Sequence, residues 1–261
     1  MKSSYPLVRH GRRVRWDVPR VLLMAAALAA AAPPARAGEG ATGSYSGWFR
    51  SDGARSPVAG ADYSTGDLPD GPGTARGFFL FDMSHFELLR GQRITFARVT
   101  LQTFQVRTDD PSETVTFYDV SAPRETLMAD AAGGSAVGQS VFVDLGTGTT
   151  YAQRSYTPAD SGSTQAVELN DAAIAALQVL LDGQGQRDFA VGTAVTTLDA
   201  SDNTEVVYRG GAGPLSPTLF FRTVPVPEPG LALTLPLCGA ALLARGRRPV
   251  VGRGASPGGR W

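Results

Sequence analysis

The sequence predicts an all-β protein, a β-sandwich or jelly roll of about nine short strands with one short helix. From Gly38 to Val224, short β-branched, aromatic and other apolar runs alternate with clusters of Gly, Asp, Ser and Pro, which is typical of strands joined by turns. No internal repeat is visible, and this length suits one domain with its own core. We therefore expect a single β domain over residues 38–224, flanked by an N-terminal signal peptide and a C-terminal hydrophobic helix.

The expected strands follow the apolar runs in chain order. In the longest one the apolar positions nearly alternate, and a slip between Phe96 and Val99 indicates a bulge. The run Phe78, Phe79 and Phe81 indicates core residues. The strands are expected at Tyr45–Arg50, Arg76–Asp82, Arg93–Phe104, Glu113–Val120, Ser140–Asp144, Thr164–Leu169, Asp188–Val191, Glu205–Tyr208 and Pro217–Thr223.

One helix is expected at Ala172–Leu181. Asn170 can cap its first turn through the side-chain oxygen, and Gly183 would supply a left-handed exit. Three apolar residues share one face of this helix, namely Ile174, Leu177 and Leu181. We expect the helix to cover an open end or edge of the sandwich.

Residues 1–37 have the order of a signal peptide. Five arginines precede an apolar stretch from Val21 to Ala32, and the small residues Ala35 and Ala37 occupy the positions that signal peptidase reads. Twelve apolar residues are short for a membrane span. We expect general secretion with cleavage after Ala37; twin-arginine export through Arg12-Arg13 and an uncleaved membrane helix are the alternatives.

The C-terminal residues combine a rigid motif, an apolar segment and a basic stop. Pro227-Glu228-Pro229 precedes an apolar run from Gly230 to Ala244, and the basic residues after it are Arg245, Arg247 and Arg248. These arginines would hold the end of the chain on the cytoplasmic side of a bilayer. At about 1.5 Å of rise per residue, the run covers only part of the roughly 30 Å of hydrocarbon. Such a segment suits processing better than permanent anchoring.

This tail resembles a PEP-CTERM sorting signal, the C-terminal element of bacterial exported proteins that an exosortase processes. The resemblance implies a signal over residues 225–249, recognised at Pro227, Glu228 and Pro229, and a basic flexible tail over 250–261. Pro236 within the apolar run and the long extension after the basic stop depart from the usual pattern. The resemblance implies transient residence in the inner membrane and then delivery to the cell surface or extracellular matrix, with signal peptidase and exosortase as processing enzymes.

Several stretches also resemble a recurring group of exported β-sandwich proteins that carry the same signal. Members of that group are generally uncharacterised, so the resemblance implies the fold and no activity. The resembling stretches are Gly47-Trp48-Phe49, Asp62-Tyr63, Arg76 to Asp82, Tyr118-Asp119-Val120, Asp144 to Thr149, Leu169 to Ala173 and Phe189 to Gly192.

Charge is distributed unevenly along the chain. Without the seven bases and one acid of the leader, and the five bases and one acid after Val226, twelve arginines face twenty-two Asp and Glu residues. A domain about ten charges negative is not expected to bind nucleic acid, which requires cationic side chains. It would adhere to anionic lipid or polymer only through a divalent cation. Cys238, the single cysteine, lies in the apolar tail, so no disulfide is expected in the domain.

The residues for catalysis are few. After the leader His85 is the only histidine, and the domain has neither lysine nor cysteine, so imidazole metal sites and thiol or Schiff-base chemistry are not expected. Paired carboxylates could serve hydrolysis. The candidate groups are Asp109 with Asp110 or Glu113, and Asp199 with Asp202 and Glu205. The spacing selects neither group, and solvated turns are the simpler interpretation of both.

Calcium is a second use for such oxygens. The loop from Asp62 to Gly71 places Asp62, Asp67 and Asp70 among glycines, and hard oxygen ligands suit Ca²⁺. The spacing is not that of an EF-hand, and similar loops are common without a metal. A weaker candidate loop contains Asp199, Asp202, Asn203 and Glu205. We expect no other cofactor.

Tyr45 and Trp48 are candidates for stacking on sugar rings, because exposed aromatic faces pack against pyranoses. Packing in or over the sandwich core is the alternative. The sequence therefore predicts an exported, non-enzymatic surface or matrix protein, structural or adhesive, and associated with exopolysaccharide. The alternatives are a carbohydrate-active enzyme and a calcium-dependent glycan-binding module.

Overall fold

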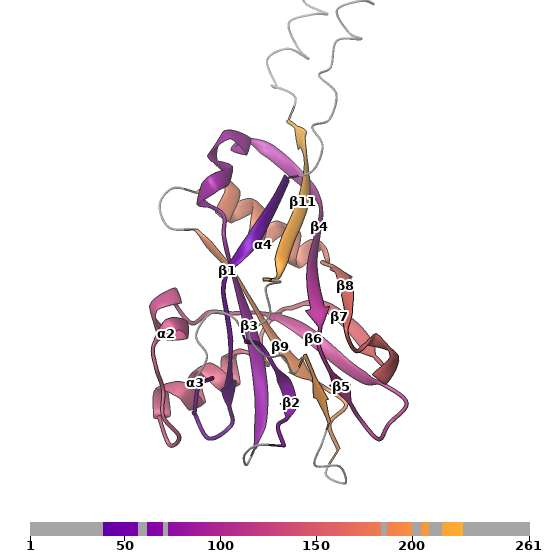
Figure 1. The fold of residues 1–261 in the computed structure, drawn as a ribbon. Helices are drawn as coiled ribbons and strands as arrows, with labels where there is room; N and C mark the ends of the chain where they lie inside the picture. The colour runs from indigo at the N-terminus through magenta and orange to yellow at the C-terminus, as the bar shows by residue number, and fades with distance from the viewer. Residues whose placement is uncertain are drawn as a thin grey trace, which may run out of the picture. The chain divides into compact units, whose positions relative to one another are not determined.

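The computed structural model describes residues 39–56, 62–69, 73–183, 187–199, 205–208 and 216–226. Within these residues, eleven strands form a curled antiparallel sheet, accompanied by short helices (Figure 1). The predicted all-β sandwich class is therefore confirmed. The expected signal peptide with Ala35 and Ala37, and the C-terminal residues from Pro227 onward, lie outside the described residues.

Strand β1 (Glu39–Arg50) takes part in both layers of the sandwich. Its first residues, 39–42, pair with β11 (Thr218–Pro225), whereas residues 43–50 pair with β3 (Thr74–Asp82). The register shifts between Gly43 and Tyr45, and such an irregularity lets a strand bend from one layer into the other. The first layer has the order β1-β11-β4-β8, with β4 at Gln92–Thr103 and β8 at Ser163–Glu168.

The second layer continues from β3. It runs β1-β3-β9-β6-β7, with β9 at Asp188–Val195, β6 at Glu113–Asp119 and β7 at Thr150–Tyr156. Three very short strands extend it from the first residues of β3 in the order β2-β10-β5. They are β2 (Thr65–Asp67), β10 (Val206–Val207) and β5 (Val106–Arg107).

Strand β3 of the second layer is buried on both faces, which explains its continuously apolar sequence. Phe79 and Phe81 contribute to the large core between the layers, whereas Phe78 and Leu80 pack into a second cluster on the outer face. All four side chains are buried. Because neighbouring side chains of a strand point to opposite faces, a run without alternation is what a doubly covered strand requires.

Helices α2 (Arg124–Met128) and α3 (Ala136–Asp144) cover that outer face. Residues 140–144 were predicted as a strand, and that prediction is wrong. Ser135 caps α3 by accepting a hydrogen bond from the Gly138 amide at 3.2 Å, and Val141 enters the outer cluster. A short apolar run with two valines does not distinguish a strand from a helix by its pattern alone.

Helix α4 (Asp171–Asp182) is the predicted helix, and its cap is confirmed. The Asn170 side chain accepts hydrogen bonds from the amides of Ala172 and Ala173, and Leu177 lies in the main core. Gln178 covers the beginning of β4, accepting from the Ile94 amide at 2.7 Å and donating to the Gln92 carbonyl at 2.9 Å. The left-handed exit is wrong, because Gly183 has φ −70° and ψ 173°.

Other predicted boundaries differ locally. The bulge in β4 falls at Thr95, since Ile94 pairs with Thr223 and Phe96 pairs with Arg222. The sequence prediction omitted β2, β5 and β7. Strand β7 was missed because polar residues separate its buried ones, Tyr151, Ala152 and Tyr156. In the part of the chain that the structure describes, no helix is both long and apolar enough to span a membrane.

Candidate metal centre

Three carboxylates from two distant segments of the chain meet at one edge of the second layer. Asp110 lies between β5 and β6, Glu113 begins β6, and Glu205 directly precedes β10. One oxygen from each side chain lies within 4.8 Å of the others. We call these three residues the acidic cluster.

The position of Glu205 is set by the short strands around it. Its carbonyl accepts a hydrogen bond from the Asp67 amide at 2.6 Å, and β10 pairs with both β2 and β5. Gly66 makes this approach possible: its φ is +107°, and a Cβ there would lie 2.1 Å from the Glu205 carbonyl oxygen. Only glycine combines that backbone conformation with such a close neighbour.

Glu113 is held at both of its oxygens. The Thr108 hydroxyl donates to Oε1 and the Thr197 hydroxyl donates to Oε2. Thr108 also accepts a hydrogen bond from the Asp110 amide at 2.9 Å, which links the loop to the strand. Each oxygen of Glu113 therefore has a hydrogen-bond partner within the chain.

Glu205 is less completely satisfied. Its Oε2 accepts a hydrogen bond from the Asp199 amide at 3.1 Å, whereas its Oε1 is buried and has no hydrogen-bond partner among the described residues. Burial raises the pKa of Glu205, and the negative charge of Glu113 raises it further, while the hydrogen bond from the Asp199 amide opposes the shift. The surroundings of Glu205 therefore disfavour an uncompensated negative charge.

Both glutamates of the acidic cluster are 0% exposed, whereas Asp110 is partly exposed. No ion pair within the described ranges involves any of the three residues. Buried carboxylates this close together are costly unless a proton or a cation compensates their charge. The cluster could therefore hold a hard cation or share a proton.

The sequence prediction contained the members of the acidic cluster but not their association. Asp110 and Glu113 came from one predicted carboxylate group and Glu205 from the other. Asp109 and Asp199 are exposed, and Asp202 and Asn203 lie outside the described residues. Pairing of β10 with β5 brings the two groups together. No local sequence pattern predicts that pairing.

The predicted calcium loop is described only in part. Asp62 accepts hydrogen bonds from the Trp48 indole at 3.1 Å and the Ser56 hydroxyl at 3.3 Å. Asp67 accepts one from the Thr74 hydroxyl at 2.8 Å. These contacts tie the loop to β1 and β3, while Asp70 lies outside the described residues. Calcium binding by Asp62, Asp67 and Asp70 stays a prediction.

The two aromatic candidates belong to different faces of β1. Tyr45 stacks on Phe78 with ring centroids 6.0 Å apart and packs against the outer cluster. Trp48, three residues later, points to the opposite face by strand alternation and donates to Asp62. Both are half-buried. They do not form one stacking platform, and sugar binding by either stays a prediction.

His85, the only histidine of the expected mature domain, lies at the surface. The His85 side chain is 78% exposed on the 3₁₀ helix η1 (Ser84–Leu89), 3.6 Å from Asp82.

A pocket of about 430 Å³ lies between α2 and α3, and its one charged lining residue is Asp144. Asp144 accepts bonds from the Ser121 hydroxyl and from the amides of Ser121 and Ala122. Its oxygens are therefore used in fixing the backbone.

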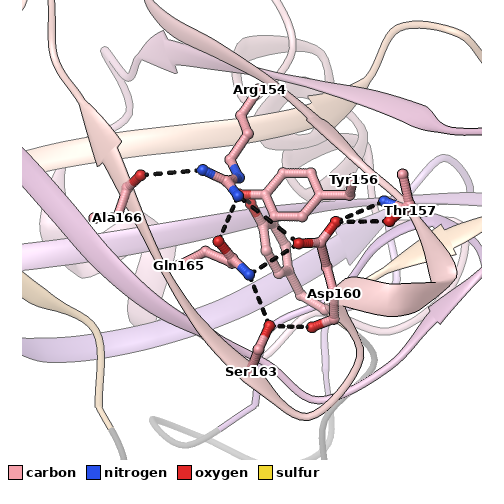
Figure 2. Close-up of polar contacts among 8 residues, drawn as sticks. Arg154, Tyr156, Thr157, Asp160, Ser163, Gln165 and Ala166 are labelled. Carbon is pink, nitrogen blue, oxygen red and sulfur yellow. Dashed lines mark hydrogen bonds and ion pairs between the residues drawn. The ribbon is translucent and has the colours of Figure 1, made fainter.

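A polar network lies at the β7–β8 connection (Figure 2). The 3₁₀ turn η2 (Pro158–Asp160) begins with a reciprocal cap between Thr157 and Asp160. Gln165 donates to Asp160 at 2.9 Å and to Ser163 at 2.7 Å, while Arg154 pairs with Asp160 at 3.8 Å. Arg154 also donates to Gln165 and to the Ala166 carbonyl. This network contains its own cation.

No family model matches the chain, and a search of curated proteins finds no similar sequence.

Proposed function

We propose that the protein is an exported, non-enzymatic β-sandwich of the cell surface or extracellular matrix, where it is a structural or adhesive component associated with exopolysaccharide. The observation that carries the proposal is the tripartite C-terminal tail, which begins at Pro227-Glu228-Pro229. Strand β11 ends at Pro225 and lies between β1 and β4 in its sheet. Cleavage at the motif would therefore leave every described strand in place, as a sorting substrate requires.

The composition of the domain agrees with exposure outside the cell. The described residues contain no cysteine, and the main core consists of packed aliphatic and aromatic side chains from both layers. The fold therefore depends on burial of apolar surface rather than on the redox state of its surroundings. The negative charge of the expected mature domain favours solubility and opposes direct adhesion to anionic polymers.

Burial of the acidic cluster favours a non-enzymatic role over hydrolysis. A glycosidase presents its two carboxylates to a sugar ring on either side of the bond that breaks. Glu113 and Glu205 are 0% exposed, so a polysaccharide could reach neither of them without local opening of the fold. Turnover of a polysaccharide panel by the purified protein, lost on Glu113→Gln, would contradict the proposal.

A calcium-dependent module is the second candidate, and the acidic cluster is the observation that favours it. This candidate is compatible with the first, because a matrix protein can take part of its stability from a cation. It adds a requirement for metal that the first candidate does not contain.

The sorting proposal is tested by mass spectrometry of the protein from inner-membrane, surface and matrix fractions of cells that express the full chain. We expect an N-terminus at Gly38 and a C-terminus at or near Pro227–Pro229 in the surface or matrix fraction. A Glu228→Ala variant should accumulate uncut in the membrane fraction, whereas Glu168→Ala, an exposed change on β8, should be processed normally. An intact wild-type C-terminus retained in the inner membrane would contradict the proposal.

A further inference from the structure

Four charged side chains in the described part of the chain are buried, and they fall into two kinds. Arg55 and Arg187 are 7% and 2% exposed, and each has an acidic partner. Arg55 Nη1 lies 3.2 Å from Asp130 Oδ1, and Arg187 Nη2 lies 2.6 Å from Glu87 Oε1. The other two are Glu113 and Glu205, and neither has a basic partner within the described residues. Within the described ranges, the two buried cations therefore have acidic partners and the two buried anions have no basic partner.

We propose that Asp110, Glu113 and Glu205 bind a divalent cation, Ca²⁺ by preference, which supplies the positive charge that the acidic cluster requires. The site goes beyond sorting and surface display, and it differs from the predicted loop with Asp62, Asp67 and Asp70. It connects the segment between β5 and β6 to β10, across the edge of the second layer.

An unpartnered atom supports this site independently of the clustering. Oε1 of Glu205 is buried and accepts no hydrogen bond from the described residues, although Oε2 of the same carboxylate does. Buried polar atoms are nearly always satisfied in folded proteins, and exceptions commonly mark an ion or water site. The same carboxylate belongs to the group whose oxygens lie within 4.8 Å of one another, so the side chain with the unsatisfied oxygen is one of the three expected ligands.

The ligand chemistry selects the class of cation. All three side chains offer only oxygen, and no histidine or cysteine contributes to the cluster, which favours a hard ion such as Ca²⁺ over zinc or copper. Calcium–oxygen distances of about 2.3–2.6 Å let ligands on opposite sides of the ion stand up to roughly 5 Å apart. The separations in the acidic cluster fall within that limit without any movement. Mg²⁺ binds at about 2.0–2.1 Å in a stricter octahedron, so it fits less readily.

A shared proton is the competing way to lower the charge. Such a proton would lie on one of the three carboxylates. It would remove one negative charge of the three, whereas a divalent cation compensates two. The two possibilities differ in their response to added metal.

Thermal unfolding and titration calorimetry of the protein from cells that express the full chain, after treatment with a chelator, separate these possibilities. We expect CaCl₂ to release or absorb heat with one ion per chain. It should raise Tm by roughly 5–10 °C at a hundredfold excess over Kd, and MgCl₂ should act more weakly. Glu205→Gln keeps the size of the side chain and should abolish both responses, as should Asp110→Asn.

Asp109→Asn is the matched control, because Asp109 neighbours Asp110 but is exposed and outside the acidic cluster. This variant should keep the full calcium response. Wild-type protein with no calcium heat and no rise in Tm would overturn the site. A response that survives both Glu205→Gln and Asp110→Asn would also overturn it, by placing calcium elsewhere. Processing at Pro227–Pro229 is measured separately, so failure of one proposal leaves the other standing.

Discussion

The acidic cluster and the Arg154 network are two polar groups that meet at the same strand pair, since Glu113 on β6 lies opposite Tyr156 on β7. In the Arg154 network, the guanidinium contacts Asp160, Gln165 and the Ala166 carbonyl (Figure 2). In the acidic cluster three carboxylates meet and no basic side chain of the described residues joins them. One group contains a basic side chain, and the other contains none among the described residues.

This difference shows where a fold can accept an external ligand. The Arg154 network is built within one β7–β8 connection, so the chain supplies donors and acceptors together. The acidic cluster joins residues on β6 and before β10, which lie far apart in sequence. A carboxylate with a basic partner loses much of the cost of burying its charge, whereas carboxylates that meet without such a partner are costly. The acidic cluster is therefore the part of the domain whose stability should depend on solution conditions.

The largest loss of stability should come from a substitution that displaces Glu205. Gly66→Ala puts a Cβ about 2.1 Å from the Glu205 carbonyl oxygen at a residue with φ +107°, so β2 and β10 must separate. We expect a loss of roughly 3 kcal/mol or more in the free energy of unfolding, together with loss of the calcium response. Chemical denaturation with and without Ca²⁺ measures both.

Gly91→Ala is the control for that substitution. Gly91 also has a positive φ, +76°, but a Cβ there meets nothing within 4 Å. It should cost about 1 kcal/mol from backbone strain alone and should keep the calcium response. Equal losses in the two variants would show that the contact between Gly66 and Glu205 does not hold the site.

Removal of the Arg154 guanidinium should cause a smaller loss of stability. Arg154→Met keeps much of the apolar stem over Tyr156, whose ring centroid lies 5.3 Å from the guanidinium carbon, but loses the contacts to Asp160, Gln165 and Ala166. Because Arg154 and Asp160 are partly exposed, we expect a loss of about 1–2 kcal/mol. Urea denaturation measures it, and the rise in Tm with Ca²⁺ should equal that of the wild type. A diminished calcium response would contradict the independence of the two groups.

Opposite signs are expected when one carboxylate in each group is neutralised without metal. Glu205→Gln removes a buried like charge and should stabilise chelator-treated protein at pH 7 by about 1 kcal/mol. Asp160→Asn removes the acceptor of Arg154 and of the Thr157 cap and should destabilise by a similar amount. Parallel urea denaturation of the two variants tests the comparison, and destabilisation by Glu205→Gln under these conditions would contradict it.

The smallest change in stability is expected at the hydrogen bond of Tyr63, which involves no charged group. Its hydroxyl donates to the Gln102 carbonyl at 2.8 Å, and burial raises its pKa to about 12 from the ordinary value of 10. The folded state therefore holds this proton more tightly than the unfolded state, so the associated stability is complete below pH 10 and is lost as the pH rises towards 12. Tyr63→Phe should cost about 1 kcal/mol at pH 8 and should flatten the decline in Tm between pH 10 and 12. An unchanged decline would show that Tyr63 is not its source.

Local features of the sequence were predicted well, and features that arise from long-range pairing were not. Helix α4 was predicted because Asn170 and the spacing of Leu177 and Leu181 are local signals. The prediction of a strand at helix α3 is wrong because Val141 and Val143 do not reveal whether the segment crosses a sheet or lies on it. Its place over the outer cluster decides the matter. The bulge was expected between Phe96 and Val99 but falls at Thr95, where the register with β11 sets it.

The acidic cluster likewise depends on long-range pairing that local sequence features do not predict. Glu113 and Glu205 were both recognised as candidate carboxylates, but they were placed in separate groups because each had acidic neighbours in sequence. Their meeting depends on β10, a strand of two residues that pairs with β5 and β2. Strands so short have no periodicity to detect. Burial of both glutamates, which distinguishes them from the exposed Asp109 and Asp199, follows from that same pairing.

The most direct test of calcium binding by the acidic cluster is a crystal structure of the protein grown with Ca²⁺. Anomalous scattering identifies the ion. We predict one calcium ion bound at about 2.3–2.6 Å by an oxygen of each of Asp110, Glu113 and Glu205. The three carboxylates lying directly against one another or against a basic side chain, with no ion between them at saturating Ca²⁺, would contradict it.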